Sequence, residues 1–344
     1  MLKESLWNSQ KDVLKSSIRS LSYISMVYFN SFLGYMSIIL GCIVGALRVE
    51  RLFLQWVCLE VNMLCIIPVL LGSSTQDSIM CGVKYFISQR AASVSFLFSM
   101  LLIDSIRFLS IIAIASIIFK LGVPPFHRWI IGIIFNINLL EVFLVLTIQK
   151  FIPLIILSQL GINEIRLLVL MGISGFFIIV NVNSNLSLQF ILFLSSVGNG
   201  IWILAGLIGQ VWGIFLTIYS VILLGAVRRL LTRKSLKFRD IATGDNGKKI
   251  EVALQFFNLG GVPPLIGFAV KLIVLKNLTF LRVIRLLRLI LISVIVLYIY
   301  IRMMYQVYTV NPASYRYESR ARSTKLLTIN TSLILCFRLV IWLL

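Results

Sequence analysis

Residues 119–129 read FKLGVPPFHRW, and residues 260–271 read GGVPPLIGFAVK. In both stretches the tetrad Gly-Val-Pro-Pro interrupts a long apolar run. Proline lacks a backbone N–H and clashes with the preceding helical turn, so each run is predicted to form a broken helix. The residues expected to make the two breaks are Gly122, Pro124, Pro125, Gly261, Pro263 and Pro264.

The composition indicates a membrane protein. Of the 344 residues, 59% are hydrophobic and 13% are charged, and the mean hydropathy is +1.01. A soluble domain is about 45–50% apolar and about 25% charged. Long apolar runs recur along the chain, whereas a β-barrel would show short alternating segments. The expected fold class is therefore an all-α polytopic membrane protein, with one transmembrane domain over residues 21–344.

About eleven transmembrane helices are predicted, most of them near the ~20 residues that cross the hydrocarbon core. Their approximate ranges are 21–47, 52–71, 79–103, 107–135, 138–158, 165–183, 187–208, 210–231, 251–276, 283–308 and 326–344. The fourth helix is broken around 122–126 and the ninth around 260–267. Because these two helices are an odd number apart, they run in opposite directions. Paired broken helices of this kind are typical of an inverted-repeat transporter.

The net charge of +20 does not indicate nucleic-acid binding, because Lys and Arg cluster between and at the ends of apolar segments. That distribution sets membrane orientation. The positive-inside rule predicts an inner N-terminus, and the odd helix count then places Leu344 on the outer side. Residues 1–20 are polar, basic and rich in serine, with apolar residues near helical spacing. They are expected to form an amphipathic surface helix, with a disordered tail as the alternative.

No metal or cofactor site is predicted. The five cysteines form no Cys-x-x-Cys pair, and His127 is the only histidine. Zinc, iron–sulfur and haem sites need clusters of such ligands. We therefore expect that this chain carries no redox centre.

Four ionisable residues lie inside predicted membrane helices: Glu60, Lys120, Lys150 and Lys271. A charge at the bilayer centre costs at least ~2.5–3.5 kcal/mol, so such residues usually serve a function. Their expected use is to hold and pass protons or ions. Alternatives remain open, since a lysine can extend toward the membrane surface and Glu60 can form a purely structural pair.

His127 follows the first Pro-Pro pair and titrates near neutral pH, so it is a candidate relay or gating residue. A lone histidine can equally be a hydrogen-bonded structural residue. Glu141 lies near a helix start and is interpreted as structural or accessory. Arg302 and Arg338 lie nearer helix ends and are interpreted as interfacial anchors or partner contacts.

Several motifs resemble the antiporter-like membrane subunits of respiratory complex I, the NADH:ubiquinone oxidoreductase, and within them the subunit 2 type. The matching runs are WVCLEVNML at 56–64 with IP at 67–68, KYFISQ at 84–89 with AS at 92–93, FKLGVPPFHRW at 119–129, QKFIP at 149–153, and GGVPPLIGFAVK at 260–271. The helix count resembles the animal form, which lacks three N-terminal helices of bacterial relatives.

The resemblance implies a proton-translocating subunit in the mitochondrial inner membrane. Glu60 would pair with Lys120, and Lys150 and Lys271 would extend the relay. FMN, iron–sulfur clusters and ubiquinone would bind elsewhere in the complex. The expected partners are other membrane-arm subunits, including further antiporter-like subunits, and phospholipids such as cardiolipin at residues 228–249. The N-terminus would face the matrix and the C-terminus the intermembrane space.

One departure from the family pattern follows Trp129. Most members of the family read Val-Pro-Glu-Val there, whereas this chain has Ile130, Ile131, Gly132 and Ile133. A relay role for that family acid therefore does not transfer to this chain. Two other functions stay open at this point, a subunit of a multisubunit cation/proton antiporter and a purely structural membrane subunit.

Overall fold

The computed structural model describes residues 31–72, 76–102, 109–182, 187–232, 241, 246–278 and 283–309. Within these ranges every regular element is a helix and no strand occurs, which confirms the all-α fold class. The predicted amphipathic extension 1–20 and the last predicted helix 326–344 lie outside the described residues. Arg338 lies outside them as well. Of the basic segment 228–249, residues 233–240 and 242–245 also lie outside them.

The first half of the chain contains a helix at Ser31–Arg48 followed by seven elements. They are α2 (Leu52–Leu70), α3 (Gln76–Leu101), α4 (Leu109–Leu121), α5 (Arg128–Ile134), α6 (Leu139–Leu146), the 3₁₀ helix η1 (Ile148–Lys150) and α7 (Phe151–Leu160). The second half contains α8 (Glu164–Asn181), α9 (Leu188–Ile208), α10 (Trp212–Thr232), α12 (Asn246–Gly260), α13 (Ile266–Leu278) and α14 (Val283–Thr309).

Seven helical spans of the described residues are long and apolar enough to cross a membrane. They are Ser31–Arg48, Leu52–Leu70, Leu139–Leu160, Glu164–Asn181, Leu188–Ile208, Trp212–Leu231 and Leu286–Tyr305. Helix α3 has 26 residues but is too polar to be among them. The chain is thus a polytopic helical protein, while the predicted number of eleven spans stays a prediction.

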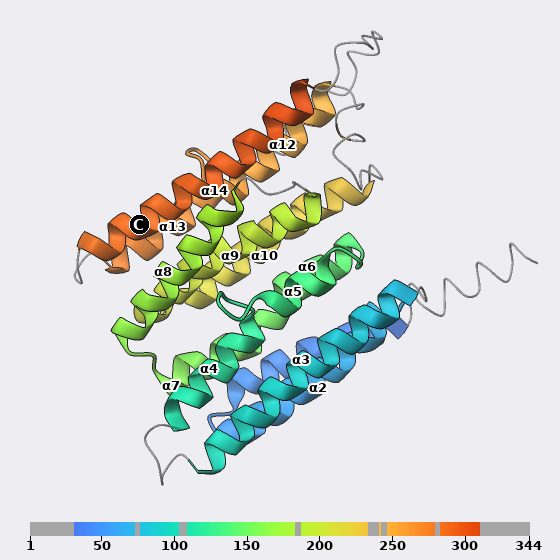
Figure 1. Ribbon diagram of the computed structural model, residues 1–344, viewed down its shortest axis with the longest axis vertical. Coiled ribbons are helices and arrows are strands. Elements are labelled where there is room, and N and C mark those ends of the chain that lie inside the picture. Colours follow the sequence, from blue (N-terminus) through green and yellow to red (C-terminus); the bar gives the residue numbers. More distant parts are fainter. Residues whose placement is uncertain are drawn as a thin grey trace, which may run out of the picture.

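The helices run side by side, in order from α2 and α3 through α4–α7 and α8–α10 to α12–α14 (Figure 1). Helix α9 forms the centre of the second half, because every residue from Phe190 to Gly206 is buried. It packs against α8, α10, α13 and α14. A helix that is apolar on all sides is expected at such a buried position.

The two predicted broken helices are confirmed. Helix α4 ends at Leu121 and α5 begins at Arg128, while α12 ends at Gly260 and α13 begins at Ile266. Each turn contains the same kind of backbone hydrogen bond. In the first turn the N–H of Phe126 donates to the Val123 carbonyl, and in the second the N–H of Leu265 donates to the Val262 carbonyl, both at 2.9 Å.

Each break begins with a glycine in the left-handed region, with φ of 65° at Gly122 and 76° at Gly261. Other L residues rarely adopt this conformation. At Gly122 space also requires glycine, since an added Cβ would lie 1.9 Å from Cδ1 of Ile130. Both tetrads therefore fold into the same kind of turn.

A third interruption lies where the sequence predicts one continuous helix over 138–158. Helix α6 ends at Leu146, and η1 separates it from α7. The Thr147 hydroxyl donates to the Phe143 carbonyl at 2.7 Å, a bond that tends to bend helices. Pro153 lacks the N–H that would donate to the Gln149 carbonyl. The predicted segment is confirmed as the single apolar span Leu139–Leu160, and the irregular turn inside it carries Lys150.

Candidate functional site

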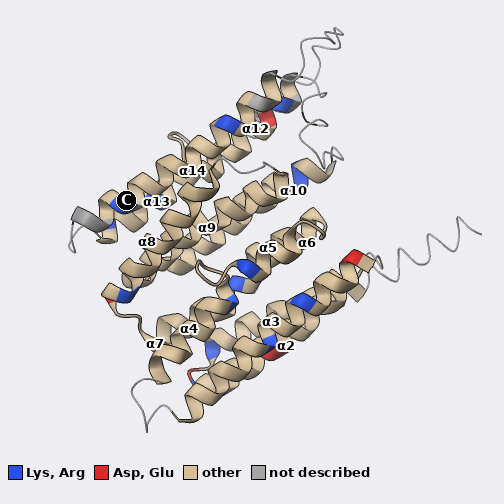
Figure 2. Cartoon of the chain, viewed as in Figure 1, with Lys and Arg blue, Asp and Glu red and all other residues tan. Residues whose placement is uncertain are grey.

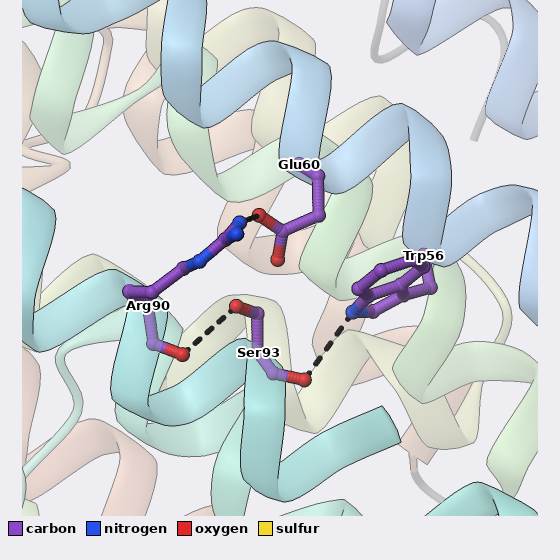
Figure 3. A network of polar contacts seen from close by, with 4 residues as sticks. All are labelled: Trp56, Glu60, Arg90 and Ser93. Atoms are coloured by element: carbon purple, nitrogen blue, oxygen red, sulfur yellow. Dashed lines mark hydrogen bonds and ion pairs between the residues drawn. The ribbon is translucent and has the colours of Figure 1, made fainter. Parts of the chain in front are cut away.

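The candidate site begins at Glu60, which α2 holds in a buried position. Its Oε2 accepts a hydrogen bond from Nη1 of Arg90 on α3, and the two side chains form an ion pair (Figure 3). One turn away, Nε1 of Trp56 donates to the carbonyl oxygen of Ser93 at 3.2 Å. These contacts clamp α2 to α3. The sequence reasoning missed Arg90, although a basic residue in the middle of the predicted helix 79–103 is a usable signal.

Lys120 lies at the end of α4, two residues before the first break. Its Nζ is buried and makes no hydrogen bond to the described residues, and Oε1 of Glu60 also has no partner. Glu60 and Arg90 are the charged groups that interact electrostatically with Lys120. The Glu60 carboxylate contacts Arg90, and its charge also acts on Lys120. A direct Glu60–Lys120 pair stays a prediction.

A junction of three neutral side chains connects α2 and α3 to the turn that carries Lys150. Nδ2 of Asn62 donates to Oε1 of Gln149 at 3.1 Å, and Nε2 of Gln149 donates back to Oδ1 of Asn62 at 3.2 Å. The Tyr85 hydroxyl donates to the same Gln149 oxygen at 3.2 Å. The sequence analysis used these residues only as parts of motifs. Their mutual contacts depend on helix packing, which spacing alone does not reveal.

Lys150 points into the bundle from η1. Its side chain is buried, and Nζ donates to the Ser196 carbonyl of α9 at 3.4 Å. A lysine that extends to the membrane surface would leave its amino group exposed. The geometry of Lys150 therefore does not fit that alternative.

Lys271 lies on α13 and reaches back to the second break. Its Nζ donates to the Gly260 carbonyl at 2.6 Å and lies 5.6 Å from the centre of the Trp202 ring. The carbonyl belongs to the last residue of α12, where the break leaves acceptors without helical partners. An added Cβ at Gly261 would come within 2.8 Å of Nζ. The second break thus forms a close-fitting site for an ammonium group.

The first break has no such bond to its lysine. There the Phe119 carbonyl accepts a hydrogen bond from Nε1 of Trp129 at 2.9 Å. An indole thus occupies one acceptor that the break leaves free, and Lys120 has no hydrogen-bond partner there. The two breaks have similar backbones but place their lysines differently.

A small cavity lies beside the second break, between α9, α10, α12 and α13. Polar groups in its wall come from Asn199, Tyr219 and Asn258. Oδ1 of Asn258 also accepts from the Gly267 N–H at 2.9 Å. The cavity has room for about one water molecule, and its mostly apolar wall offers these few polar groups as partners.

His127 lies at the start of α5 and packs among aromatic rings. The centre of its imidazole is 3.9 Å from that of Phe177 on α8 and 6.4 Å from that of Phe193 on α9. Its Nδ1 has no hydrogen-bond partner among the described residues. The geometry therefore shows a packing role, and the relay or gating role stays a prediction.

Charged side chains outside this group fill structural positions. Glu141 accepts from the backbone N–H and the side-chain amide of Asn138, which caps the start of α6. Arg302 donates to the Val182 carbonyl at 2.7 Å, close to the end of α8. Arg229 pairs with Glu251 at 3.2 Å between α10 and α12. Figure 2 shows how sparse such charges are along the helices.

The described residues contain no group of three or more His, Cys, Asp or Glu side chains that could hold a metal ion. Five charged residues instead lie on elements that follow one another along the chain, and we call them the charged row. They are Glu60 on α2, Arg90 on α3, Lys120 on α4, Lys150 on η1 and Lys271 on α13. Across the bundle the order of the labelled helices runs from α2 and α3 through α4 to α13 (Figure 1). All residues of the charged row except Arg90 are between 5% and 7% exposed.

This combination of two helices broken at Gly-Val-Pro-Pro and a row of buried lysines defines an antiporter-like membrane subunit. No protein-family profile matches the chain. A NADH-ubiquinone oxidoreductase chain 2 from Xenopus laevis is 31% identical over 244 residues, covering 66% of this chain and 71% of the relative. The same protein from Aquarana catesbeiana is 30% identical over 314 residues, covering 82% and 89%. The chain belongs to the NADH-ubiquinone oxidoreductase chain 2 family.

Solved structures share the fold. A chain of respiratory complex I from Thermus thermophilus superposes with a TM-score of 0.73 at 16% identity, covering 89% of this chain and 78% of that one. A chain of the Mrp complex from Dietzia sp. superposes with a TM-score of 0.65 at 13% identity, covering 77% and 58%. At these identities the likeness establishes the architecture alone.

Proposed function

We propose that this chain is a membrane-arm subunit of respiratory complex I that moves protons while the complex transfers electrons from NADH to ubiquinone. The observation that carries the proposal is the row of buried lysines, two of which lie next to helix breaks. Keeping several charges at membrane depth is costly, so a row of them requires a functional reason. Membership of the chain 2 family supports the same reading.

In this proposal the proton carriers are the amino groups of Lys120, Lys150 and Lys271. A lysine at membrane depth can change between its charged and neutral forms when a neighbouring charge moves. Glu60 is the acid that can move between Arg90 and Lys120. When the Glu60 carboxylate turns to Lys120, it stabilises the protonated amino group of Lys120. When the carboxylate returns to Arg90, Lys120 can release its proton to the next carrier.

The path onward from Lys120 is proposed to pass the junction of Asn62, Tyr85 and Gln149. These side chains both donate and accept hydrogen bonds, so they can order water between the lysines. Lys150 then connects to α9 through the Ser196 carbonyl. The cavity beside α13 would hold water near Lys271. No redox group is assigned to this chain, and electron transfer would take place on cofactors of other subunits.

The proposed location is the mitochondrial inner membrane, with the N-terminus in the matrix and the C-terminus in the intermembrane space. The excess of Lys and Arg on the N-terminal side supports this orientation. Other membrane-arm subunits, further antiporter-like subunits among them, are the proposed partners. Cardiolipin is the proposed lipid for the basic segment 228–249.

The test is a Lys120→Met variant in the assembled complex, with Lys276→Met as control. Lys276 is an exposed lysine at the end of α13, so the control removes a lysine that is not buried in the bundle. We expect Lys120→Met to lower both the NADH:ubiquinone activity and the proton-to-electron ratio. Undiminished values in a complex of normal subunit composition would falsify the relay role. Exchange of Na⁺ for H⁺ by the isolated chain in liposomes would instead favour an antiporter subunit.

A further inference from the structure

Arg90 is an exposed, positively charged residue in the middle of α3. Arg90 is the fifteenth of the 26 residues of α3, and its side chain is 50% exposed. At 1.5 Å per residue the helix is about 39 Å long, which puts Arg90 about 21 Å from its first residue and about 17 Å from its last. Both distances exceed the reach of an arginine side chain. The guanidinium is therefore held at the depth where contact with lipid is most costly.

The composition of α3 also argues against a lipid-facing helix. It is long enough to span a membrane, yet it lacks the apolar stretch that the other long described helices have. Its outward face alternates between exposed apolar residues, such as Val83, Val94 and Phe98, and the exposed cations Lys84 and Arg90. A mixed face of this kind is typical of a protein interface inside a membrane.

The hydrogen bonds of Arg90 point to what covers this face. A guanidinium has five N–H donors, and among the described residues its hydrogen-bond partner is Glu60 alone. The charges of Glu60 and Arg90 both act on Lys120, so one carboxylate serves two basic groups. When Lys120 is protonated, these three side chains lack one negative charge. In a medium of low dielectric constant that deficit favours a second carboxylate nearby.

Among the described residues, Glu60 is the acid that contacts Arg90, and no second carboxylate contacts it. Glu141 caps α6, and Glu251 pairs with Arg229. Asp77 and Glu164 lie in the first turns of their helices, far from the middle of α3. Residues 326–344, which the sequence predicts to be a further membrane helix, contain no Asp or Glu. The described part of the chain therefore leaves the second acceptor to be supplied from outside it.

We propose that the outward face of α3 around Arg90 is an interface with a membrane-spanning helix of another subunit, and that this helix presents a carboxylate to Arg90. The proposal rests on the depth, exposure and charge of Arg90, and it does not depend on proton transfer by the lysines. It assigns to α3 a contact that the relay itself does not need.

The test is photo-crosslinking from position 94 in the assembled complex. Val94 is 56% exposed and lies one helical turn from Arg90 on the same outward face. A photoreactive residue there is expected to label a helix of another subunit that carries Asp or Glu within about one turn of the labelled residue. Labelling of phospholipid, of residues 326–344, or of a helix without an acid would overturn the proposal.

The matched control places the same photoreactive residue at Val221, an exposed apolar position on α10. This variant should not label the acidic helix, and if it does, the interface is not specific to α3. A second measurement keeps the probe at position 94 and adds Arg90→Leu or Arg90→Lys. We expect Arg90→Leu to reduce the crosslink at least about tenfold and Arg90→Lys to retain most of it, because an unpaired buried carboxylate is costly. An unchanged yield with Arg90→Leu would contradict the charge pairing.

Discussion

At the scale of single residues, the buried charged side chains differ in their hydrogen-bond and ion-pair partners. Glu60 contacts Arg90, Lys150 donates to the Ser196 carbonyl, and Lys271 donates to the Gly260 carbonyl. Lys120 has no hydrogen-bond partner among the described residues. This difference makes Lys120 the lysine whose surroundings change most when the Glu60 carboxylate moves. In the proposed relay, Lys120 is therefore the starting point, because it is the lysine on which the charge of Glu60 acts.

One prediction at this scale concerns the first helix break. Gly122→Ala should destabilise the chain by about 1–3 kcal/mol, because alanine disfavours the left-handed backbone and its Cβ would clash with Ile130. Gly132→Ala is the control, since an added Cβ there meets no atom within 4 Å. The measurement is the fraction of assembled complex that survives a series of temperatures. Equal survival of the two variants would mean that the break does not require glycine.

At the scale of elements, three interrupted helices carry or flank the lysines. The two Gly-Val-Pro-Pro tetrads cause two of the interruptions, because proline lacks the backbone N–H that a helix needs, and this signal is visible in the sequence. The third, at η1, depends on the Thr147 hydroxyl bonding to its own helix and on Pro153 after it. This irregular turn gives Lys150 its inward direction and brings Gln149 to Asn62.

The element-scale prediction tests that junction. Asn62→Leu leaves the half-buried amide of Gln149 with Tyr85 as its remaining partner, which should cost about 1–3 kcal/mol. In a Tyr85→Phe background, the double variant Asn62→Leu with Gln149→Leu removes every polar group of the junction and should lose less than the sum of the two single losses, because apolar side chains need no partners. Thermal survival of the complex measures both. If the double variant loses the sum of the single losses, the amides are not coupled.

At the scale of the whole molecule, the fold class, the two tetrad breaks and the family could be predicted from the sequence. Apolar runs and Gly-Pro chemistry act locally, so they can be recognised without knowing which helices touch. The ion pair of Glu60 with Arg90 and the amide junction join residues from different helices, and no spacing rule indicates them. The Thr147 interruption was missed because threonine often occurs in regular helices.

The central claim is that the buried lysines belong to one hydrated path across the bundle. It is tested most directly by a map of the assembled complex at a resolution that shows ordered water. We predict a continuous set of water molecules joining Nζ of Lys120 to Nζ of Lys150, past Gln149, and continuing toward Lys271. Dry apolar packing between these amino groups would contradict the account.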